Sequence, residues 1–521
     1  MTTTATPVRP SPARLGAGAA AFAGLIGAAV ALGASELIAG LLSGASSLVA
    51  AVGQTVIDLQ PPGAKDFVVA LFGTNDKLAL ELFVSGTALA IGAGLGVLAR
   101  ARFIVAALGF AAFGLVGFFA AARTSLGSEA FTALSAAIAV AAGVQVMSWL
   151  LDRAGGRDRR AGMPDWSRRS LLVRGSAIGV AAVAAGIGGR TLIQRASAPP
   201  AGADDEIPPA SDPIANVPEG ADLSEQVENL TPIIIPNDRF YLIDTALLVP
   251  VVDTATWQLR IHGMVERETT LSWEELIGLP LFEQYVTIAC VSNEVGGNLV
   301  GNAKWTGVRL REVLDMAGVQ EGATQLVGRS VDGWTAGMPT AWVMDPAREP
   351  MIAVRMNDEP LPPSHGFPAR LIVPGLYGYV SATKWLTELE LTTLEAFDAF
   401  WVPRGWAKEA PILTQSRIDT PRRGATIPAG TIAIAGVAWA PDRGVGTVEV
   451  GIDGEWREAR LSNPISDATW VQWVYEWDAP AGVHMIQVRA TDGAGQVQEE
   501  RSTPPAPDGA RGWHEIRVNV T

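Results

Sequence analysis

The stretch YVTIACVSNEVGGNLVGNAKWTGVRL, residues 285–310, contains Cys290, the only cysteine among 521 residues. Its apolar start at 285–289 predicts a buried strand, and the glycine-rich part at 296–301 predicts a loop whose backbone can approach a ligand closely. Cys290 is therefore expected at a strand-to-loop junction. A solitary cysteine has no internal disulfide partner and is most often an inert small hydrophobe. The functional alternative is a thiolate that ligates a metal whose other positions are filled by a cofactor.

A second stretch, SHGFPARLIVPGLYGYVSATKWL at 364–386, supplies the context. It places His365, Arg370 and Lys384 around an apolar strand predicted at 371–374, beside two glycines. This composition suits a buried anionic group. Taken singly, each residue is more typical of a solvated loop or a structural histidine, so the functional interpretation depends on the combination.

Together the two stretches resemble the molybdenum-cofactor domain of the sulfite oxidase family. That family has one cysteine ligand to molybdenum, and an H-G-F-P-x-R segment and a V-K-W-L segment that bind the pterin and its phosphate. The corresponding parts here are Cys290, residues 365–370 and residues 383–386. The resemblance covers residues 230–521, and three motifs in the same order make it specific.

The resemblance implies an α+β domain that binds Mo-molybdopterin, with the metal held by two dithiolene sulfurs, oxo groups and the Cys290 thiolate. The metal would cycle by two electrons as an oxygen atom moves to or from the substrate. The resemblance assigns the pterin contacts to Asn237, Tyr241, Asp332, His365, Arg370, Ala382, Thr383 and Lys384. Arg370 and Lys384 would pair with the phosphate. The catalytic candidates are Phe400 or Trp401, in place of a tyrosine that follows the K-W-L motif in the family, and Arg404.

The substrate pocket departs from the family pattern. True sulfite oxidases have an arginine in each of three segments that correspond here to FYLID at 240–244, CVSNEV at 290–295 and AGVAW at 435–439. None of the three places an arginine where the family does. The resemblance therefore implies an enzyme that handles sulfite poorly and prefers a neutral or larger substrate, such as a sulfoxide. The cations that could compensate are Arg404, Lys408 and Arg417.

The first part of the chain has the composition of a membrane protein. Hydrophobic residues make up 48% of the chain and the mean hydropathy is +0.24, which is too apolar for an ordinary soluble enzyme. Stretches long enough to span a bilayer occur at 15–35, 78–98, 103–122 and 131–151, and a fifth, rich in Ala and Gly, at 171–189. The interrupted run at 37–59 predicts an interfacial or re-entrant segment.

The positive charges predict the orientation, because cytoplasmic flanks collect Lys and Arg. Residues 1–199 carry 16 Lys and Arg against 9 Asp and Glu, and the arginines gather before the first span, between the second and third, and between the fourth and fifth. We therefore expect a multi-pass cell-membrane protein with an inside N-terminus and an extracytoplasmic domain. Residues 200–521 carry 23 Lys and Arg against 44 Asp and Glu, which argues against nucleic acid as a partner.

The segment SRRSLLVRG at 167–175 precedes the fifth span and resembles an internal twin-arginine export signal. The alternative is an ordinary positive flank on the cytoplasmic side. The implied cofactor favours the export signal. A domain folded around a pterin assembled in the cytoplasm must cross the membrane already folded, and the twin-arginine route carries folded cargo.

The predicted spans offer no ligands for a redox centre. The histidines are His262, His365, His484 and His514, so the spans cannot hold a bis-histidine haem, and one cysteine cannot hold an iron–sulfur cluster. Glu36 and Glu81 lie near span ends, where an interfacial position is favoured over a proton path. The expected partners are a small-molecule substrate and an electron carrier, either a quinone or a membrane-associated redox protein.

The predicted fold is multi-domain: an all-α transmembrane bundle at 1–195, a Pro-rich linker at 196–230, the α+β molybdopterin domain at 231–412, and a β-sandwich of immunoglobulin type at 413–521. The sandwich is inferred from short alternating strands with turn signals. It resembles the family's dimerisation domain, which implies a homodimer. Two function classes remain: an exported, membrane-anchored molybdopterin oxidoreductase, or a non-catalytic exterior scaffold that keeps the fold.

Overall fold

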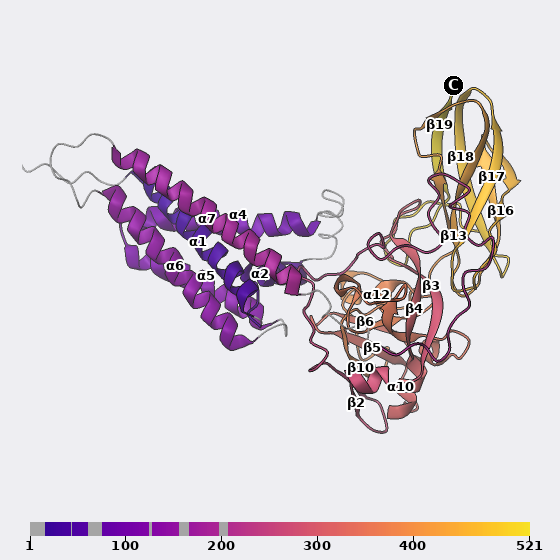
Figure 1. Ribbon diagram of the computed structural model, residues 1–521, viewed down its shortest axis with the longest axis horizontal. Coiled ribbons are helices and arrows are strands. Elements are labelled where there is room, and N and C mark those ends of the chain that lie inside the picture. Colours follow the sequence, from indigo (N-terminus) through magenta and orange to yellow (C-terminus); the bar gives the residue numbers. More distant parts are fainter. Residues whose placement is uncertain (1–15, 43, 61–75, 124–127, 156–165, 197–206) are drawn as a thin grey trace, which may run out of the picture. The chain divides into compact units, whose positions relative to one another are not determined.

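The computed structural model describes residues 16–42, 44–60, 76–123, 128–155, 166–196 and 207–521 (Figure 1). Two compact units are present: one is Met1–Ser197 with Thr245–Val249, and the other is Ala198–Asp244 with Pro250–Thr521. Several predicted features lie outside the described residues: Arg9, Arg14, Lys65, Arg157, Arg159, Arg160, and 197–206 of the predicted linker.

The first unit is helical. Its helices are α1 (Ala17–Leu41), α2 (Leu48–Asp58), α4 (Asp76–Ala99), α5 (Phe103–Ala122), α6 (Glu129–Gly155) and α7 (Trp166–Ala196). All but α2 are long and apolar enough to cross a membrane, by length and composition. The five predicted apolar stretches therefore form five long helices.

Helix α1 packs against α4, α6 and α7. Glycines permit the close approach: a methyl group at Gly24 would overlap the carbonyl of Gly92, and one at Gly40 would overlap the carbonyl of Gly189. Small residues at helix crossings are typical of bundles in lipid, where close packing replaces the hydrophobic effect.

The region 37–59, predicted as an interfacial or re-entrant segment, contains the end of one helix and a second, short helix. Helix α1 continues to Leu41, and after a turn α2 occupies Leu48–Asp58. Eleven residues rise only about 16 Å, too little to cross a bilayer. Glu36, near the end of α1, is only 7% exposed, and its carboxylate accepts from the Ser47 hydroxyl, whose oxygen lies 2.8 and 2.9 Å from the two carboxylate oxygens.

The α+β part of the second unit is built on two sheets. One has the strand order β2-β1-β10-β5-β6, in which β1 and β10 are parallel. The other has the order β3-β4-β7-β8, with β9 also paired to β7. The strands are β1 (Gln258–Gly263), β2 (Thr269–Ser272), β3 (Leu281–Ala289), β4 (Val300–Arg309), β5 (Gln325–Ser330), β6 (Thr335–Pro339), β7 (Met351–Met356), β8 (Glu359–Pro360), β9 (Arg370–Ile372) and β10 (Leu386–Thr392).

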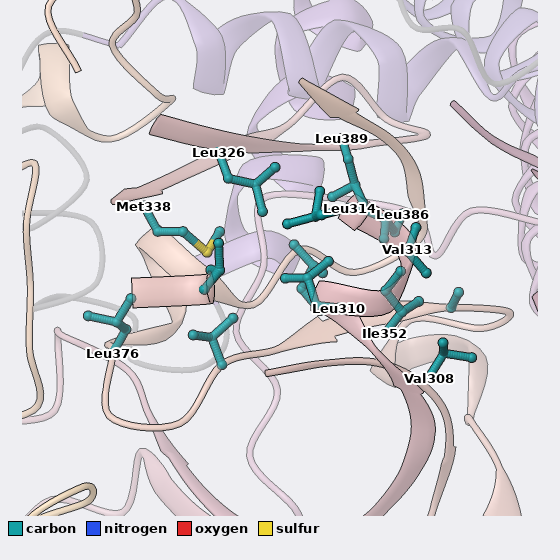
Figure 2. Close-up of a cluster of buried hydrophobic side chains, with 14 of the residues drawn as sticks. Val308, Leu310, Val313, Leu314, Leu326, Met338, Ile352, Leu376, Leu386 and Leu389 are labelled. Atoms are coloured by element: carbon teal, nitrogen blue, oxygen red, sulfur yellow. The ribbon is translucent and has the colours of Figure 1, made fainter. Parts of the chain in front are cut away.

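Short helices connect these strands: α9 (Trp273–Ile277), α10 (Leu310–Ala317), α11 (Thr340–Met344), α12 (Gly378–Ser381) and the 3-10 turn Pro363–His365. Helix α9 begins at Ser272, whose side chain forms a capping box with Glu275. Figure 2 shows the core that joins the sheets, in which Leu310 and Leu314 of α10 meet Leu326 and Leu389. Each of these leucines is fully buried.

The C-terminal part consists of two further sheets, β11-β13-β17-β16 and β12-β19-β18-β14-β15. Their strands are β11 (Gln415–Thr420), β12 (Thr426–Ile427), β13 (Gly430–Trp439), β14 (Val445–Ile452), β15 (Glu455–Glu458), β16 (Arg460–Leu461), β17 (Val471–Ala479), β18 (Gly482–Asp492) and β19 (His514–Val520). All pairings are antiparallel except β12 with β19.

The two parts of the second unit share buried contacts. Trp470, fully buried, donates from its ring Nε1 to the Ile233 carbonyl and from its backbone N–H to the Thr287 hydroxyl, each at 2.8 Å. The described part of the predicted linker, 207–230, also packs here, since Leu223 is 2% exposed and its N–H donates to Gln472. The C-terminal sheets are thus fixed to the α+β part.

Candidate active site

Cys290 follows the last residue of β3 and is 8% exposed. Its N–H donates to the Leu299 carbonyl at 2.9 Å, and its carbonyl accepts from Asn293 N–H at 3.1 Å. The Asn293 side chain in turn accepts from Leu299 N–H at 2.8 Å. The cysteine therefore lies at the predicted strand-to-loop junction, at the base of a closed loop.

Two tyrosines face the cysteine. Burial, with a smaller contribution from the charge of Cys290, raises the pKa of Tyr377 to about 12 and also raises the pKa of Tyr241. Helix α12 lies beside the end of β3, since a Cβ at Gly378 would lie 3.7 Å from the Ala289 carbonyl oxygen. Burial thus keeps both phenols protonated at neutral pH.

Arg370 begins β9 and is 3% exposed. One Nη donates to the His365 carbonyl at 2.9 Å, and the guanidinium lies 5.1 Å from the centre of the Trp305 ring. Its Nε is buried and has no hydrogen-bond partner among the described residues, and the same is true of the Thr383 hydroxyl. Burial lowers the pKa of Arg370 to about 10, so it remains a cation at neutral pH.

The Arg370 Nε and the Thr383 hydroxyl, which lack hydrogen-bond partners among the described residues, indicate whether an anionic cofactor fits here. A buried polar atom without a partner costs roughly 1–3 kcal/mol, so such atoms are rare unless a ligand completes them. The groups lie on adjacent backbone segments, because Leu371 N–H donates to the Thr383 carbonyl at 2.9 Å. A buried cation and a buried hydroxyl without acceptors can donate hydrogen bonds to a phosphate or to a pterin carbonyl. These residues therefore fit a molybdopterin cofactor.

Lys384 and His365 complete this cationic corner. Lys384 Nζ donates to Asp244 and to the Ser364 carbonyl, each at 2.8 Å. His365 Nε2 lies 2.9 Å from the Asn237 carbonyl, which assigns the ring proton to Nε2. Burial, followed by the charges of Lys384 and Arg370, lowers the pKa of His365 to about 4, so the ring is neutral at pH 7.

Three predicted pterin residues contribute differently. Asn237 directs its amide away, donating to the Met356 carbonyl at 3.0 Å and accepting from Asn357 at 2.8 Å, so its backbone carbonyl is the group that reaches His365. Asp332 accepts from Trp334 N–H at 3.1 Å, and burial raises the pKa of its carboxyl. Ala382 ends α12, with its N–H bonded to Gly378.

The catalytic candidates form a cluster of their own beside β6. Phe400 N–H donates to the Thr335 hydroxyl at 3.0 Å, and its ring lies 5.1 Å from that of Trp401. The Arg404 guanidinium lies 3.8 Å from the centre of the Phe400 ring and donates to the Phe400 carbonyl. The structure thus groups these three with each other, whereas Cys290 is grouped with Tyr241 and Tyr377.

The cations that could replace the family's arginines have other partners. Lys408 pairs with Asp398 at 2.6 Å. Arg417 pairs with Asp419 at 2.7 Å and also donates to the Gly297 carbonyl at 2.8 Å and the Thr231 hydroxyl at 3.0 Å. Arg417 therefore connects the cysteine loop to β11.

Sequence reasoning missed the contribution of Tyr377 and of the segment at 508–511. A Cβ at Gly509 would lie 2.6 Å from the Tyr377 hydroxyl, and Arg511 binds both oxygens of Asp508 at 2.9 Å. The paired tyrosines of GLYGYVS, between a strand and the K-W-L motif, were the available signal for Tyr377. No local sequence pattern marks Arg511 as a residue near the site, because its position depends on long-range packing.

Comparison with known proteins agrees with this geometry. Residues 246–401 match the family model described as the oxidoreductase molybdopterin binding domain. The chain is 30% identical over 342 residues to human mitochondrial sulfite oxidase, covering 55% of this chain and 62% of the human protein. It is 34% identical over 174 residues to rice nitrate reductase [NADH] 1, covering 28% of this chain and 19% of that protein.

The solved structure of the sulfane dehydrogenase SoxCD from Paracoccus pantotrophus aligns with a TM-score of 0.50 at 22% identity, covering 56% of this chain and 82% of that one. At this identity the likeness concerns the fold alone. The chain thus carries a molybdopterin-dependent oxidoreductase domain, with Mo-molybdopterin as its cofactor. That domain is similar to the sulfite oxidases, and the chain spans less than two thirds of the length of the human protein that it matches.

Proposed function

We propose that this chain is a membrane-anchored, exported oxidoreductase that transfers an oxygen atom to or from a neutral small molecule, and that it is not a true sulfite oxidase. The observation that carries the proposal is the pairing of the cations near Cys290. Lys384 is paired with Asp244, and Arg511 with Asp508 and Glu499. Arg370 carries a buried charge without a carboxylate, and its unpaired Nε suits the cofactor.

In this proposal Cys290 ligates the molybdenum, while Arg370, Thr383 and Lys384 bind the phosphate and pterin. When bound, the cofactor supplies two-electron oxygen-atom transfer. His365, neutral at pH 7, offers Nδ1 as an acceptor, because its Nε2 proton is engaged by Asn237. Tyr241 and Tyr377, kept protonated by burial, can donate hydrogen bonds to a substrate oxygen. Asp332 and Ala382 lie along the pterin.

Sulfite is a small, strongly hydrated anion, so a buried site must replace its hydration with fixed positive partners. Removing one partner of a buried charge pair costs roughly 3–5 kcal/mol, and the missing family arginines would therefore weaken sulfite binding by orders of magnitude. A neutral sulfoxide needs no such partner, and its oxygen can accept from the two phenols.

In this proposal, the remaining parts of the chain have the arrangement that the sequence predicts. Five apolar helices support a multi-pass anchor, and the arginine distribution supports an exterior position for residues after 191. The C-terminal sheets would form an immunoglobulin-type sandwich at 413–521 that closes the mouth of the site and mediates a homodimer. The electron carrier would be a quinone or a membrane-associated redox protein.

The test of the reaction is steady-state kinetics on the purified, metal-loaded chain with sulfite and with a small sulfoxide, each with an artificial electron carrier. We expect a far larger kcat/KM for the sulfoxide. Sulfite turnover with a micromolar KM would overturn the substrate assignment, and absence of molybdenum from the exported protein would favour a scaffold.

Export has a separate test. Changing Arg168 and Arg169 to lysine keeps both charges, so the orientation of the spans is retained while twin-arginine recognition is lost. We expect the domain after 191 to stay inside, as measured by protease protection in spheroplasts. Unchanged export would show that the two arginines act only as a positive flank.

A further inference from the structure

The helical unit contains an apolar cavity of about 240 Å³ between α1, α2, α4, α5 and α6. Among the residues that line it, only Ser35 and Thr87 carry a polar side chain. An apolar cavity of about 150 Å³ holds a benzene molecule, so this one can accept a substituted six-membered ring. Its inner wall includes Ala28, Phe110 and Ala139, each at most 6% exposed.

The cavity reaches the outer surface of the helical unit. Phe83 of α4 and Phe113 and Val116 of α5 line it and are 67%, 42% and 57% exposed. In a bilayer these side chains would face hydrocarbon, so a ligand would enter sideways from the lipid. Short helix α2 supplies Leu48, Val49, Val52 and Val56 to the wall.

A polar network lies close to the cavity, at the end of the bundle where α1 and α7 finish and α4 begins. The Glu36 carboxylate accepts from Ser47, and Arg190 lies 4.0 Å from Glu36 and also pairs with Glu81. Ser35, 2% exposed, lines the cavity next to Glu36, and its hydroxyl donates to the Leu32 carbonyl at 2.8 Å. The Ser35 oxygen can therefore accept one hydrogen bond from a ligand hydroxyl.

We propose that this cavity binds the head ring of an isoprenoid quinone, with the ring near Ser35, which can accept from a hydroxyl of the reduced (quinol) form, and with the chain leaving between α4 and α5. A phospholipid would put its polar group at the membrane surface and only a flexible chain inside, whereas this cavity is ring-sized and has an aromatic wall and one buried polar wall group. The assignment rests on the proposed function only in naming the electron carrier, because binding itself requires no turnover.

The experiment measures quinone retained by the full chain in nanodiscs of phosphatidylglycerol doped with menaquinone or ubiquinone, by extraction and chromatography. The cavity-filling variant combines Ala88→Leu and Ala139→Leu, on α4 and α6. The matched control combines Ala90→Leu and Ala137→Leu, on the same helices at exposed positions outside the cavity. We expect one quinone per chain in wild type and control, and at least a tenfold loss in the cavity-filling variant.

A second measurement uses the wild-type protein, so that it does not depend on correct folding of the cavity-filling variant. Wild-type protein is labelled with a photoreactive quinone, and we expect cross-links on α1, α4 and α5. Labelling elsewhere, retention of phospholipid alone, or equal quinone content in all variants would overturn the proposal. Turnover with the artificial carrier is measured in parallel on the wild type: bound quinone without turnover would refute the proposed reaction, and turnover without any bound quinone would refute the site.

Discussion

Two regions of the second unit each bury an arginine, and they differ in how that charge is satisfied. On the cofactor face, which we define as Cys290, Tyr241, His365, Arg370, Thr383 and Lys384, Arg370 is 3% exposed and has an unpaired Nε. At the interdomain joint, defined as Thr231, Gly296, Gly297, Arg417, Asp419 and His514, Arg417 is 7% exposed and has partners for Nε and both Nη atoms.

This difference is the one expected between a proposed ligand site and a structural contact. Burying an arginine costs free energy, which a neighbouring carboxylate offsets at the joint. The cofactor face gives Arg370 no carboxylate ion pair within the described residues, and the His365 carbonyl and the Trp305 ring offset less of the cost than a bound anion would. An incompletely satisfied buried cation is therefore better evidence for a binding site than burial alone.

The largest expected effect comes from the metal ligand. Cys290→Ser should abolish turnover while most pterin stays bound, because the pterin contacts are spread over several segments and the metal has one protein ligand. Turnover, molybdenum and extracted pterin are measured on the same preparation. Normal activity in the serine variant would show that Cys290 is not the metal ligand.

Substitution of each arginine by methionine should change the stability of the apoprotein in opposite directions. Arg417→Met leaves Asp419 buried and unpaired, so we expect a loss of roughly 3–5 kcal/mol in the free energy of unfolding. Arg370→Met removes an uncompensated buried charge, so the apoprotein should keep or increase its stability, whereas cofactor content should fall. Thermal unfolding of both apoproteins and their molybdopterin content provide the comparison. Equal destabilisation by both substitutions would erase the distinction between the two regions.

Much of the cofactor face was predictable from sequence, and the joint was not. A strand ending at Cys290, and cations following an H-G-F-P segment, are local patterns, and the structure brings His365, Arg370 and Lys384 together as expected. Arg417 was a candidate for substrate charge, yet it holds the cysteine loop. Its role depends on Thr231 and Gly297, which are 186 and 120 residues away.

The same limit applies to side-chain direction and to the bundle. The Asn237 carbonyl lies beside His365, but its side-chain amide bonds to Met356 and Asn357, and no local sequence pattern indicates this. Glu36 lies near a helix end, as predicted, and is nevertheless buried, because the N-cap residue of α2 folds back onto it. In each case a partner distant in the sequence determines the outcome.

The smallest expected effect compares the two buried histidines, one in each region. Burial is the main cause that lowers the pKa of His365 and of His514 to about 4 from 6.5, with Arg423 and Arg417 adding to it at His514. Below pH 6.5 the unfolded chain binds these protons and the folded chain does not, so stability falls as the pH drops from 6.5 to 4 and levels off below. Each shift corresponds to about 3 kcal/mol at most.

The measurement is the unfolding free energy of the apoprotein across that window, with His514→Gln and His365→Gln as variants. Each substitution should remove the contribution of that histidine to the pH dependence of the unfolding free energy, so the dependence becomes less steep. His514→Gln should also lower stability at pH 7, because its Nδ1 accepts from Ile418 N–H at 3.0 Å and its ring packs against Gly296, which has a φ of 76°. The partly buried His484, whose pKa is raised mainly by its bond to Asp453, serves as the control. Its loss should remove stability at low pH only, and a flattened slope in the His484→Gln variant would mean that burial is not what makes the other two histidines acid-sensitive.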